Sequence, residues 1–337
     1  MEKYRISVTE YTLSILMKDM VSFGFLKADG QPNKNAFLNR LIANFLDDYL
    51  AQSNEQLGQV ETLLKKYVDM EASERTRLSD ELLKSMRENY FFRLVDERSV
   101  ILSIKPTKES EEAFSVALHA LAGEQSISSF FRGLFDAYVN MPQNMRERIL
   151  FKVQFEKLVA SIEKERKVLF TFVNKPTEGM AGSLYFIGNS DEEMFNYCLF
   201  QCDDKLRTAR LSRIKSVRLL NEPASFDEDK VPLLEFQKNH SLPHPVTKKD
   251  FDVVKVRLNE EGKTLFRKIY LYRPTPFRIE DNDYYFLGNH DSIMRYFERF
   301  GRTAIILEPE YLRMKMENYY RDSFYVYQRA GKSLKSK

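Results

Sequence analysis

The amino-acid sequence predicts a multidomain α+β protein. Its 337 residues are enough for two or three domains of ordinary size, each with its own core. The order strand, helix, helix occurs twice within residues 1–144. Short strands then follow one another closely in the middle of the chain, and the C-terminal part mixes single strands with helices. These three patterns divide the chain into an N-terminal, a middle and a C-terminal domain.

The overall composition is that of a soluble globular protein, with 43% hydrophobic and 30% charged residues. No apolar run approaches the ~20 residues of a membrane span, and the start, MEKYRISVTE, lacks the apolar core of a signal peptide. We therefore expect a cytoplasmic protein without a membrane partner. The formal net charge is only +3, so any affinity for nucleic acid has to come from the grouping of basic residues.

The sequence contains no catalytic or metal-binding motif. Cys198 and Cys202 lack zinc-like spacing and a second ligand pair, so we interpret them as buried free thiols. His240 and His244 flank a proline and have no obvious third ligand. The Gly-Lys-Thr of EEGKTLF resembles the end of a phosphate-binding loop, but Arg257 stands where that loop needs glycine. We therefore expect no enzymatic activity, no metal and no cofactor.

The N-terminal domain, residues 1–144, is predicted to be a tandem repeat. Residues 4–9 alternate apolar and polar side chains as a half-buried strand does, and two amphipathic helices follow. A second strand at 99–106 and two more helices repeat this order, the last helix starting at an N-cap serine. The apolar positions of the two second helices match at an offset of 93 residues: Phe37 and Phe130, Leu38 and Phe131, Leu41 and Leu134, Ile42 and Phe135, Phe45 and Tyr138, Leu46 and Val139. We expect the strands to pair antiparallel, the four helices to interlock and residues 54–97 to form a helical linker.

This order resembles the ribbon-helix-helix family of DNA-binding proteins, in which two identical chains build a ribbon that lies in the major groove. Here both halves lie in one chain, as an intramolecular pseudo-dimer. The groove-facing residues would be Lys3, Arg5, Ser7, Ser103 and Lys105. Ile101 would be an apolar residue on the same, otherwise polar face. Few of these side chains are of the kinds that usually contact DNA bases. Two interpretations therefore stay open: a domain that recognises a DNA sequence, and a scaffold in which DNA binding is lost or weakened. An ordinary helical dimerisation domain is the third interpretation.

The middle domain, residues 145–222, is predicted to be a small, strongly bent sheet or barrel behind a lead-in helix at 145–167. Its last stretch has six basic residues and no acidic one between Lys205 and Arg218. If this stretch is extended, one face carries Lys205, Arg207, Arg213 and Lys215, and the other carries Arg210. Such a face would bind a phosphate backbone without reading bases. A solvated strand is the alternative.

The same residues resemble the WYL domain, an Sm-like β-barrel of bacterial regulators. The tripeptide that gives the family its name falls on Leu184, Tyr185 and Phe186, and its arginines fall on Arg207 and Arg213. The resemblance implies that the tyrosine and the arginines line a basic pocket for nucleic acid or a nucleotide-like ligand. Leucine replaces tryptophan and phenylalanine replaces leucine in the tripeptide. The short distance before Leu184 also indicates a shortened hairpin.

The C-terminal domain, residues 250–328, follows a proline-containing linker at 223–249 and has the β-α-β-β-α-β order of a ferredoxin-like fold. It resembles the C-terminal extension that accompanies WYL domains, including the run from Gly301 through Pro309 to Arg313. Residues 329–337 are expected to be a disordered basic tail. SLYFIGNSDEEM at 183–194 and DYYFLGNHDSIM at 283–294 are interpreted as a strand with a Gly-Asn exit turn used twice, not as a duplicated site.

Together the three parts resemble the WYL accessory proteins of type VI-D CRISPR systems. The resemblance implies a homodimer that binds single-stranded RNA through the barrel and enhances an RNA-guided RNase. Tyr185 would stack on bases and the arginines would bind phosphates. The alternative is a transcriptional repressor whose ribbon reads duplex DNA and whose barrel senses a ligand. A purely structural adaptor is the third possibility.

Overall fold

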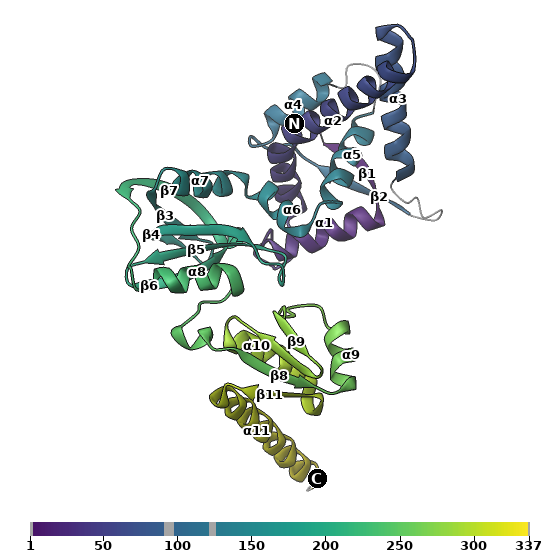
Figure 1. Cartoon of the computed structure of the whole chain (residues 1–337). Coiled ribbons are helices and arrows are strands. Elements are labelled where there is room, and N and C mark those ends of the chain that lie inside the picture. Colours follow the sequence, from purple (N-terminus) through teal and green to yellow (C-terminus); the bar gives the residue numbers. More distant parts are fainter. Residues whose placement is uncertain (1–2, 91–97, 121–125, 336–337) are drawn as a thin grey trace. The chain divides into compact units, whose positions relative to one another are not determined.

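A computed structural model describes residues 3–90, 98–120 and 126–335. The chain is a mixed α+β protein that divides into two compact units, Met1–Lys152 and Val153–Lys337. The first unit runs from purple to teal in Figure 1 and the second from teal to yellow. Each unit is described by itself.

The first unit is built on a two-stranded antiparallel ribbon of β1 (Tyr4–Thr9) and β2 (Ser99–Ile104). Its register places Ile6 opposite Leu102 on the buried face. Arg5 lies opposite Ser103 on the other face. The antiparallel pairing predicted from the sequence is therefore confirmed, and strands 95 residues apart share one apolar face.

The described residues of the first unit contain six helices. They are α1 (Glu10–Ser22), α2 (Lys34–Tyr67), α3 (Ala72–Tyr90), α4 (Glu111–Ala120), α5 (Ile127–Val139) and α6 (Gln143–Leu150). Of these, α1, α2 and α5 contact the ribbon. The N-caps of α2 and α5 are Asn33 and Ser126, which again lie 93 residues apart, and each side chain accepts a hydrogen bond from the helix. All twelve matched apolar positions of these two helices are buried. The internal repeat is thus present in caps and core alike.

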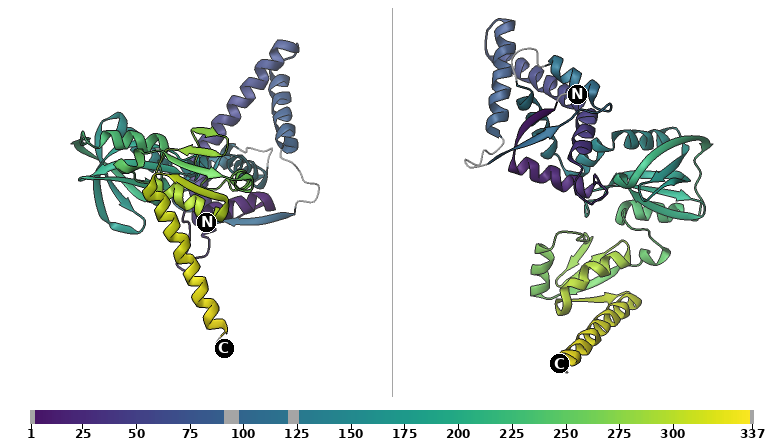
Figure 2. Two further views of the ribbon diagram at one scale, coloured as in Figure 1. Left: turned by 60° about the horizontal axis from the view of Figure 1, so that its bottom comes forward. Right: turned by 180° about the vertical axis from the view of Figure 1, so that it is seen from behind.

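The linker predicted at 54–97 is helical over most of its described residues, but its first part is continuous with the preceding helix. Helix α2 does not end before residue 54 but continues to Tyr67, because no proline interrupts its helix-forming sequence. It forms an antiparallel hairpin with α3 (Figure 2). Residues 91–97, and Gly123, where the sequence predicts the end of α4, lie outside the described residues.

A buried ionic network that the sequence did not reveal lies in the core of the first unit. Asp19 is fully buried, and its carboxylate accepts two hydrogen bonds from Arg146, from Nε at 2.7 Å and from Nη2 at 3.0 Å. The hydroxyl of Tyr138 donates to the same carboxylate at 2.9 Å. Burial, together with the neighbouring carboxylate, holds the pKa of Tyr138 well above its usual value, so the phenol stays protonated. The network connects α1, α5 and α6.

The second unit begins with a strongly bent five-stranded sheet. Its elements are α7 (Lys152–Glu163), β3 (Arg166–Phe172), β4 (Lys175–Asn189), β5 (Asn196–Cys202), β6 (Lys205–Arg210), the 3-10 turn η1 (Leu211–Arg213) and β7 (Ile214–Pro223). The strand order is β6-β5-β4-β3-β7, and Phe170 stacks on Phe200 inside the bend, with ring centroids 4.5 Å apart. The single lead-in helix expected at 145–167 is wrong. The chain leaves helical geometry at Phe151, which is buried, and residues 166 and 167 belong to β3.

The basic stretch from Lys205 to Arg218 is not one extended strand, which corrects the prediction of a shared face. Leu211 and Ile214 are both fully buried, although an odd spacing would put them on opposite faces of a strand. The 3-10 turn η1 brings residues three apart onto one side, so both can enter the core. As a result β6 and β7 lie at opposite ends of the strand order, and Lys215 does not share a strand with Arg207.

The segment expected to be a linker at 223–249 folds onto the sheet. It contains α8 (Val231–His240), and η2 (Lys248–Phe251) begins at its end. Leu234, Leu242 and Val246 are buried. Leu234 and Leu242 pack in one cluster with Tyr197 of β5. This helix therefore covers the face of β5.

The C-terminal part has the predicted β-α-β-β-α-β order and a final helix. Its elements are β8 (Val254–Leu258), α9 (Glu260–Lys268), β9 (Arg278–Glu280), β10 (Asp283–Phe286), α10 (His290–Phe297), η3 (Glu298–Thr303), β11 (Ala304–Glu308) and α11 (Glu310–Lys335). The antiparallel sheet has the order β11-β8-β10-β9 around a core that includes Phe286 and Phe297. The expectation of a disordered tail from residue 329 is wrong, since α11 continues to Lys335.

The two similar stretches diverge as predicted, but only one has the expected Gly-Asn turn. Gly288 has a φ of 142°, and Asn289 is the N-cap of α10. In the first copy β4 runs on through Gly188 to Asn189, and the chain turns later, where Met194 has a positive φ. The same Gly-Asn pair therefore ends a strand in the first copy and forms a turn before a helix in the second.

Candidate nucleic-acid interface

The β5–β6 hairpin places Arg207 and Arg210 on opposite faces. Directly opposed residues of an antiparallel pair project from the same face. Arg207 lies opposite Phe200, which is in the interior of the bent sheet. Arg210 lies opposite Tyr197, on the face covered by α8. Arg207 and Arg210 therefore point to different sides, as the alternation within β6 predicts.

Tyr185 lies on the α8 side, at a β-bulge of β4 that brings Phe186 to the same side. The register between β4 and β5 shifts between Leu184 and Phe186, so Tyr185 is the extra residue, and its ring joins the cluster under α8. Its hydroxyl donates a hydrogen bond to Glu235 of α8, and its ring meets the edge of Phe226 with centroids 5.3 Å apart. Burial, and then the bond to Glu235, raise the pKa of Tyr185 to about 12. The ring expected to stack on bases already packs against protein.

Arg210 is also held within the protein. The carbon of its guanidinium lies 3.3 Å from the centroid of the Phe195 ring, and its Nε donates to the hydroxyl of Ser212 at 2.8 Å. Both contacts lie beside the α8 cluster, to which Phe195 belongs. We therefore assign Tyr185 and Arg210 to the packing of α8 on the sheet.

Arg207 differs from Arg210. It is half-buried, and among the residues that the structure describes its Nε is enclosed without a hydrogen-bond partner. The guanidinium nevertheless has a partner in Cys202: burial and Asp203 raise the pKa of this thiol, and the charge of Arg207 and a hydrogen bond from it lower that pKa in part. Cys202 and Cys198 are buried free thiols, as predicted. An enclosed donor without an acceptor is costly in a folded protein and calls for a function or a ligand.

Three basic residues close to Arg207 in the sequence are exposed. Lys205 at the start of β6, Arg213 in η1 and Lys215 in β7 are all exposed, and none forms an ion pair with any described residue. The backbone carbonyls of Arg213 and Lys215 accept hydrogen bonds from Val173 and Gln154, so the backbone is fixed while the side chains stay in solvent. These three residues and Arg207 are here called the basic set.

The outward face of the ribbon carries the other predicted residues. Lys3, Arg5, Ser103 and Lys105 are exposed, and Ile101, at 64% exposure, lies opposite Ser7 in the middle of that face. The backbone of Ser7 is tied to α5. Its N–H donates to Ser128, and its carbonyl accepts from Arg132 at 2.7 Å. The predicted set therefore lies on one side of the ribbon, with an apolar centre.

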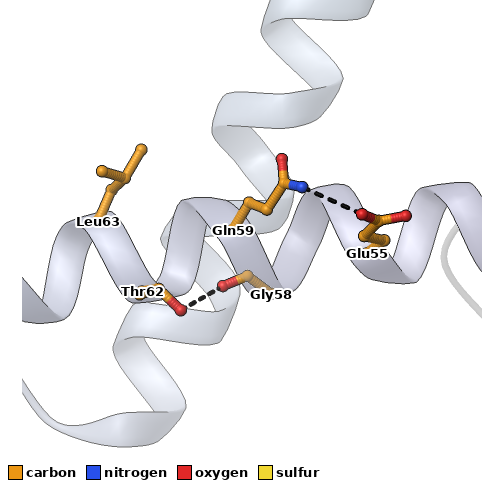
Figure 3. A pocket seen from close by; sticks show the side chains of 5 residues that line it. All are labelled: Glu55, Gly58, Gln59, Thr62 and Leu63. Atoms are coloured by element: carbon orange, nitrogen blue, oxygen red, sulfur yellow. Dashed lines mark hydrogen bonds between the residues drawn. The ribbon is translucent and has the colours of Figure 1, made fainter.

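Other kinds of site find little support. The hollow in Figure 3 is lined by a single helix, α2, and its polar groups bond one another, Gln59 to Glu55 and Thr62 to the carbonyl of Gly58. Within the described part of the chain, no group of three or more His, Cys, Asp and Glu residues is placed to hold a metal ion. None of the described helices is both long and apolar enough to cross a membrane.

Comparison with known proteins gives a fold but no family. No family model and no curated protein matches this sequence. A crystal structure of a CRISPR Cas-related protein is similar over 98% of this chain and 95% of its own, with a TM-score of 0.61 and 18% sequence identity. The proteasome accessory factor PafBC of Arthrobacter aurescens matches over 66% of this chain and 36% of its own, at 18% identity and a TM-score of only 0.22. The first likeness shows a shared fold along nearly the whole chain.

Proposed function

We propose that this protein is a non-catalytic accessory protein of a CRISPR system that binds single-stranded RNA and enhances an RNA-guided RNase. In this proposal the bent sheet is an Sm-like WYL barrel, the ribbon unit is an intramolecular ribbon-helix-helix, and the C-terminal part is its ferredoxin-like extension. The enclosed, unpartnered Nε of Arg207 carries the proposal. The similarity of fold to a CRISPR Cas-related protein supports the cellular context.

Arg207 is suited to a phosphate for a geometric reason. A guanidinium binds a phosphate through two parallel N–H donors, and Nε is one donor of the fork that it uses side-on. In this proposal the Arg207 side chain turns outward to meet the RNA, and a phosphate oxygen then gives its Nε the acceptor that it lacks inside the protein. A lysine could not replace this fork, because its ammonium is a point charge.

The exposed members of the basic set would extend the contact along a phosphate backbone. Lys205, Arg213 and Lys215 have no acidic partner among the described residues, so their charge is available to a polyanion. Their contacts would carry no sequence information, since they meet phosphates and not base edges. This favours binding to RNA of many sequences, as a general enhancer of an RNase requires. A homodimer would present the set twice.

The test is the affinity of the full chain for a labelled, unstructured RNA, measured by fluorescence anisotropy across a salt series. Arg207→Ala should raise Kd about tenfold and reduce the slope of log K against log salt by about 0.7, the value for one phosphate contact on a single strand. Arg302→Ala is the matched control, because Arg302 is exposed on η3 of the same unit. Unchanged affinity in a folded Arg207→Ala protein would reject the proposal.

The ribbon supports a second candidate, a repressor that reads duplex DNA. Its register places exposed Arg5 and Ser103 side by side on the outward face, where a duplex would lie. Arg5→Ala with Lys105→Ala should then weaken binding to duplex DNA and leave RNA affinity unchanged. An equal loss on RNA would instead make the ribbon the principal RNA surface.

A further inference from the structure

A loop of the C-terminal part combines exposed aromatic rings with positive charge. It joins α9 to β9, and together with the last two residues of α9 it forms residues 267–277, which contain three basic residues and no acidic one. Three of its rings are largely in solvent, Tyr270 at 76%, Tyr272 at 48% and Phe277 at 53% exposure. Aromatic side chains of this size are normally buried, and a group of them on one loop indicates a contact surface.

The backbone of this loop is fixed, so the rings are held in place outside the core. The hydroxyl of Tyr296 donates to the carbonyl of Ile269 at 2.6 Å, at the start of the loop. Arg273 donates from Nη1 to the carbonyl of Phe266 at 3.2 Å, and at the far end the N–H of Phe277 donates to Tyr285 at 3.0 Å.

Tyr272 itself has a φ of 60°, a conformation unusual for an aromatic residue. Strain of this kind persists only where surrounding contacts impose it, and it recurs at ligand sites. The loop therefore holds its rings in solvent although the backbone at Tyr272 is strained.

Two cations next to the rings form no ion pair with a described residue, although the pKa of Glu260 is lowered by Lys263 and, in part, by the charge of Arg267. Arg267 and Lys268, in the last turn of α9, are exposed and form no ion pair with any described residue. By contrast Lys263 pairs with Glu260 at 2.8 Å, and Arg278 pairs with Glu280 at 3.6 Å. Two exposed cations thus precede the three rings along the chain.

We propose that this loop is a second contact site for single-stranded RNA, at which bases stack on Tyr270, Tyr272 and Phe277 while Arg267 and Lys268 bind the flanking phosphates. The inference rests on the RNA binding proposed above and adds a site outside the basic set. Proteins that hold single strands without sequence preference combine a cationic surface with stacking rings in this way. A protein partner is less suited, because the cores of protein interfaces are depleted in lysine and other charged residues.

The absence of tryptophan from the sequence allows a direct test. Tyr270→Trp introduces the only indole, and its fluorescence should be quenched when a base of an unlabelled oligouridine stacks on it. Tyr327→Trp is the matched control, since Tyr327 is 80% exposed on α11 and has no part in the site. Anisotropy of labelled RNA, recorded on the same proteins, reports binding independently of the indole.

We expect saturable quenching of Tyr270→Trp with the midpoint seen by anisotropy, and none for Tyr327→Trp. Tyr270→Ala with Tyr272→Ala should raise Kd at least tenfold, and Arg267→Ala with Lys268→Ala should reduce the salt slope. RNA binding without quenching, and with full affinity in the alanine variants, would overturn this inference and leave the proposed function standing; the patch would then be a protein contact. No RNA binding by the unmodified chain would overturn both.

Discussion

Removal of Asp19 should strongly destabilise the first unit. Its carboxylate is 0% exposed and receives three hydrogen bonds, two from Arg146 and one from Tyr138. In Asp19→Ala the side chain of Arg146, only 9% exposed, and the fully buried hydroxyl of Tyr138 both lose their acceptor. Loss of one partner of a buried ion pair costs about 3–5 kcal/mol, because the other charge stays buried without compensation.

Urea unfolding followed by far-UV circular dichroism measures this loss. Arg77→Ala is the control, because Arg77 and Glu81 form an exposed pair 3.9 Å apart on α3 that should contribute no more than about 0.5 kcal/mol. Asp19→Leu with Arg146→Met should be less destabilised than Asp19→Ala alone, since the double change leaves no charge behind. A cost below about 1 kcal/mol for Asp19→Ala would refute the reasoning.

Three further changes probe the second unit. Tyr185→Phe should lower its stability by only about 1 kcal/mol in urea unfolding, because the acceptor Glu235 is 45% exposed, and a loss of more than about 2 kcal/mol would contradict this reading of the hydrogen bond. Gly262→Ala should cost more than about 2 kcal/mol in urea unfolding, because a Cβ would lie 2.3 Å from the carbonyl oxygen of Thr303, and a neutral result would contradict that contact. Burial, and then the nearby acidic groups, raise the pKa of Glu192 from 4.5 to about 7, so its contribution to stability is complete below pH 4.5 and is lost as the pH rises to about 7. In Glu192→Gln the urea midpoint of unfolding should depend less on pH between 4.5 and about 7 than in the unmodified protein. An unchanged pH dependence would show that Glu192 is not the group responsible.

Local patterns predicted much of the fold. The period of two in residues 4–9 and 99–104 gave the buried face of the ribbon, and the offset of 93 gave two matching helices with matching caps. These features depend on neighbours along the chain, which a sequence displays directly. The same holds for the β-α-β-β-α-β order of the C-terminal part.

The candidate site was less accessible, because its contacts join residues far apart in the chain. The acceptor for Tyr185 lies 50 residues away on α8, in a stretch that reads as a proline-containing linker. The turn after β6 has a signal in the sequence, because the apolar residues Leu211 and Ile214 are three positions apart and cannot share one face of a strand. No pattern in the sequence indicates that the rings of Tyr270 and Tyr272 are exposed, because exposure depends on which surfaces the rest of the domain leaves uncovered.

The ribbon within one chain has a consequence for any duplex that it meets. A ribbon made by two identical subunits has a two-fold axis, so its preferred DNA sites are palindromes. Here Arg5 faces Ser103 and Ser7 faces Ile101, and an exchange of the strands would give a different surface. A site read by this ribbon would therefore have a direction, and the protein would lie on it in one orientation only. The ribbon would also persist at any dilution, because its two strands share one covalent chain.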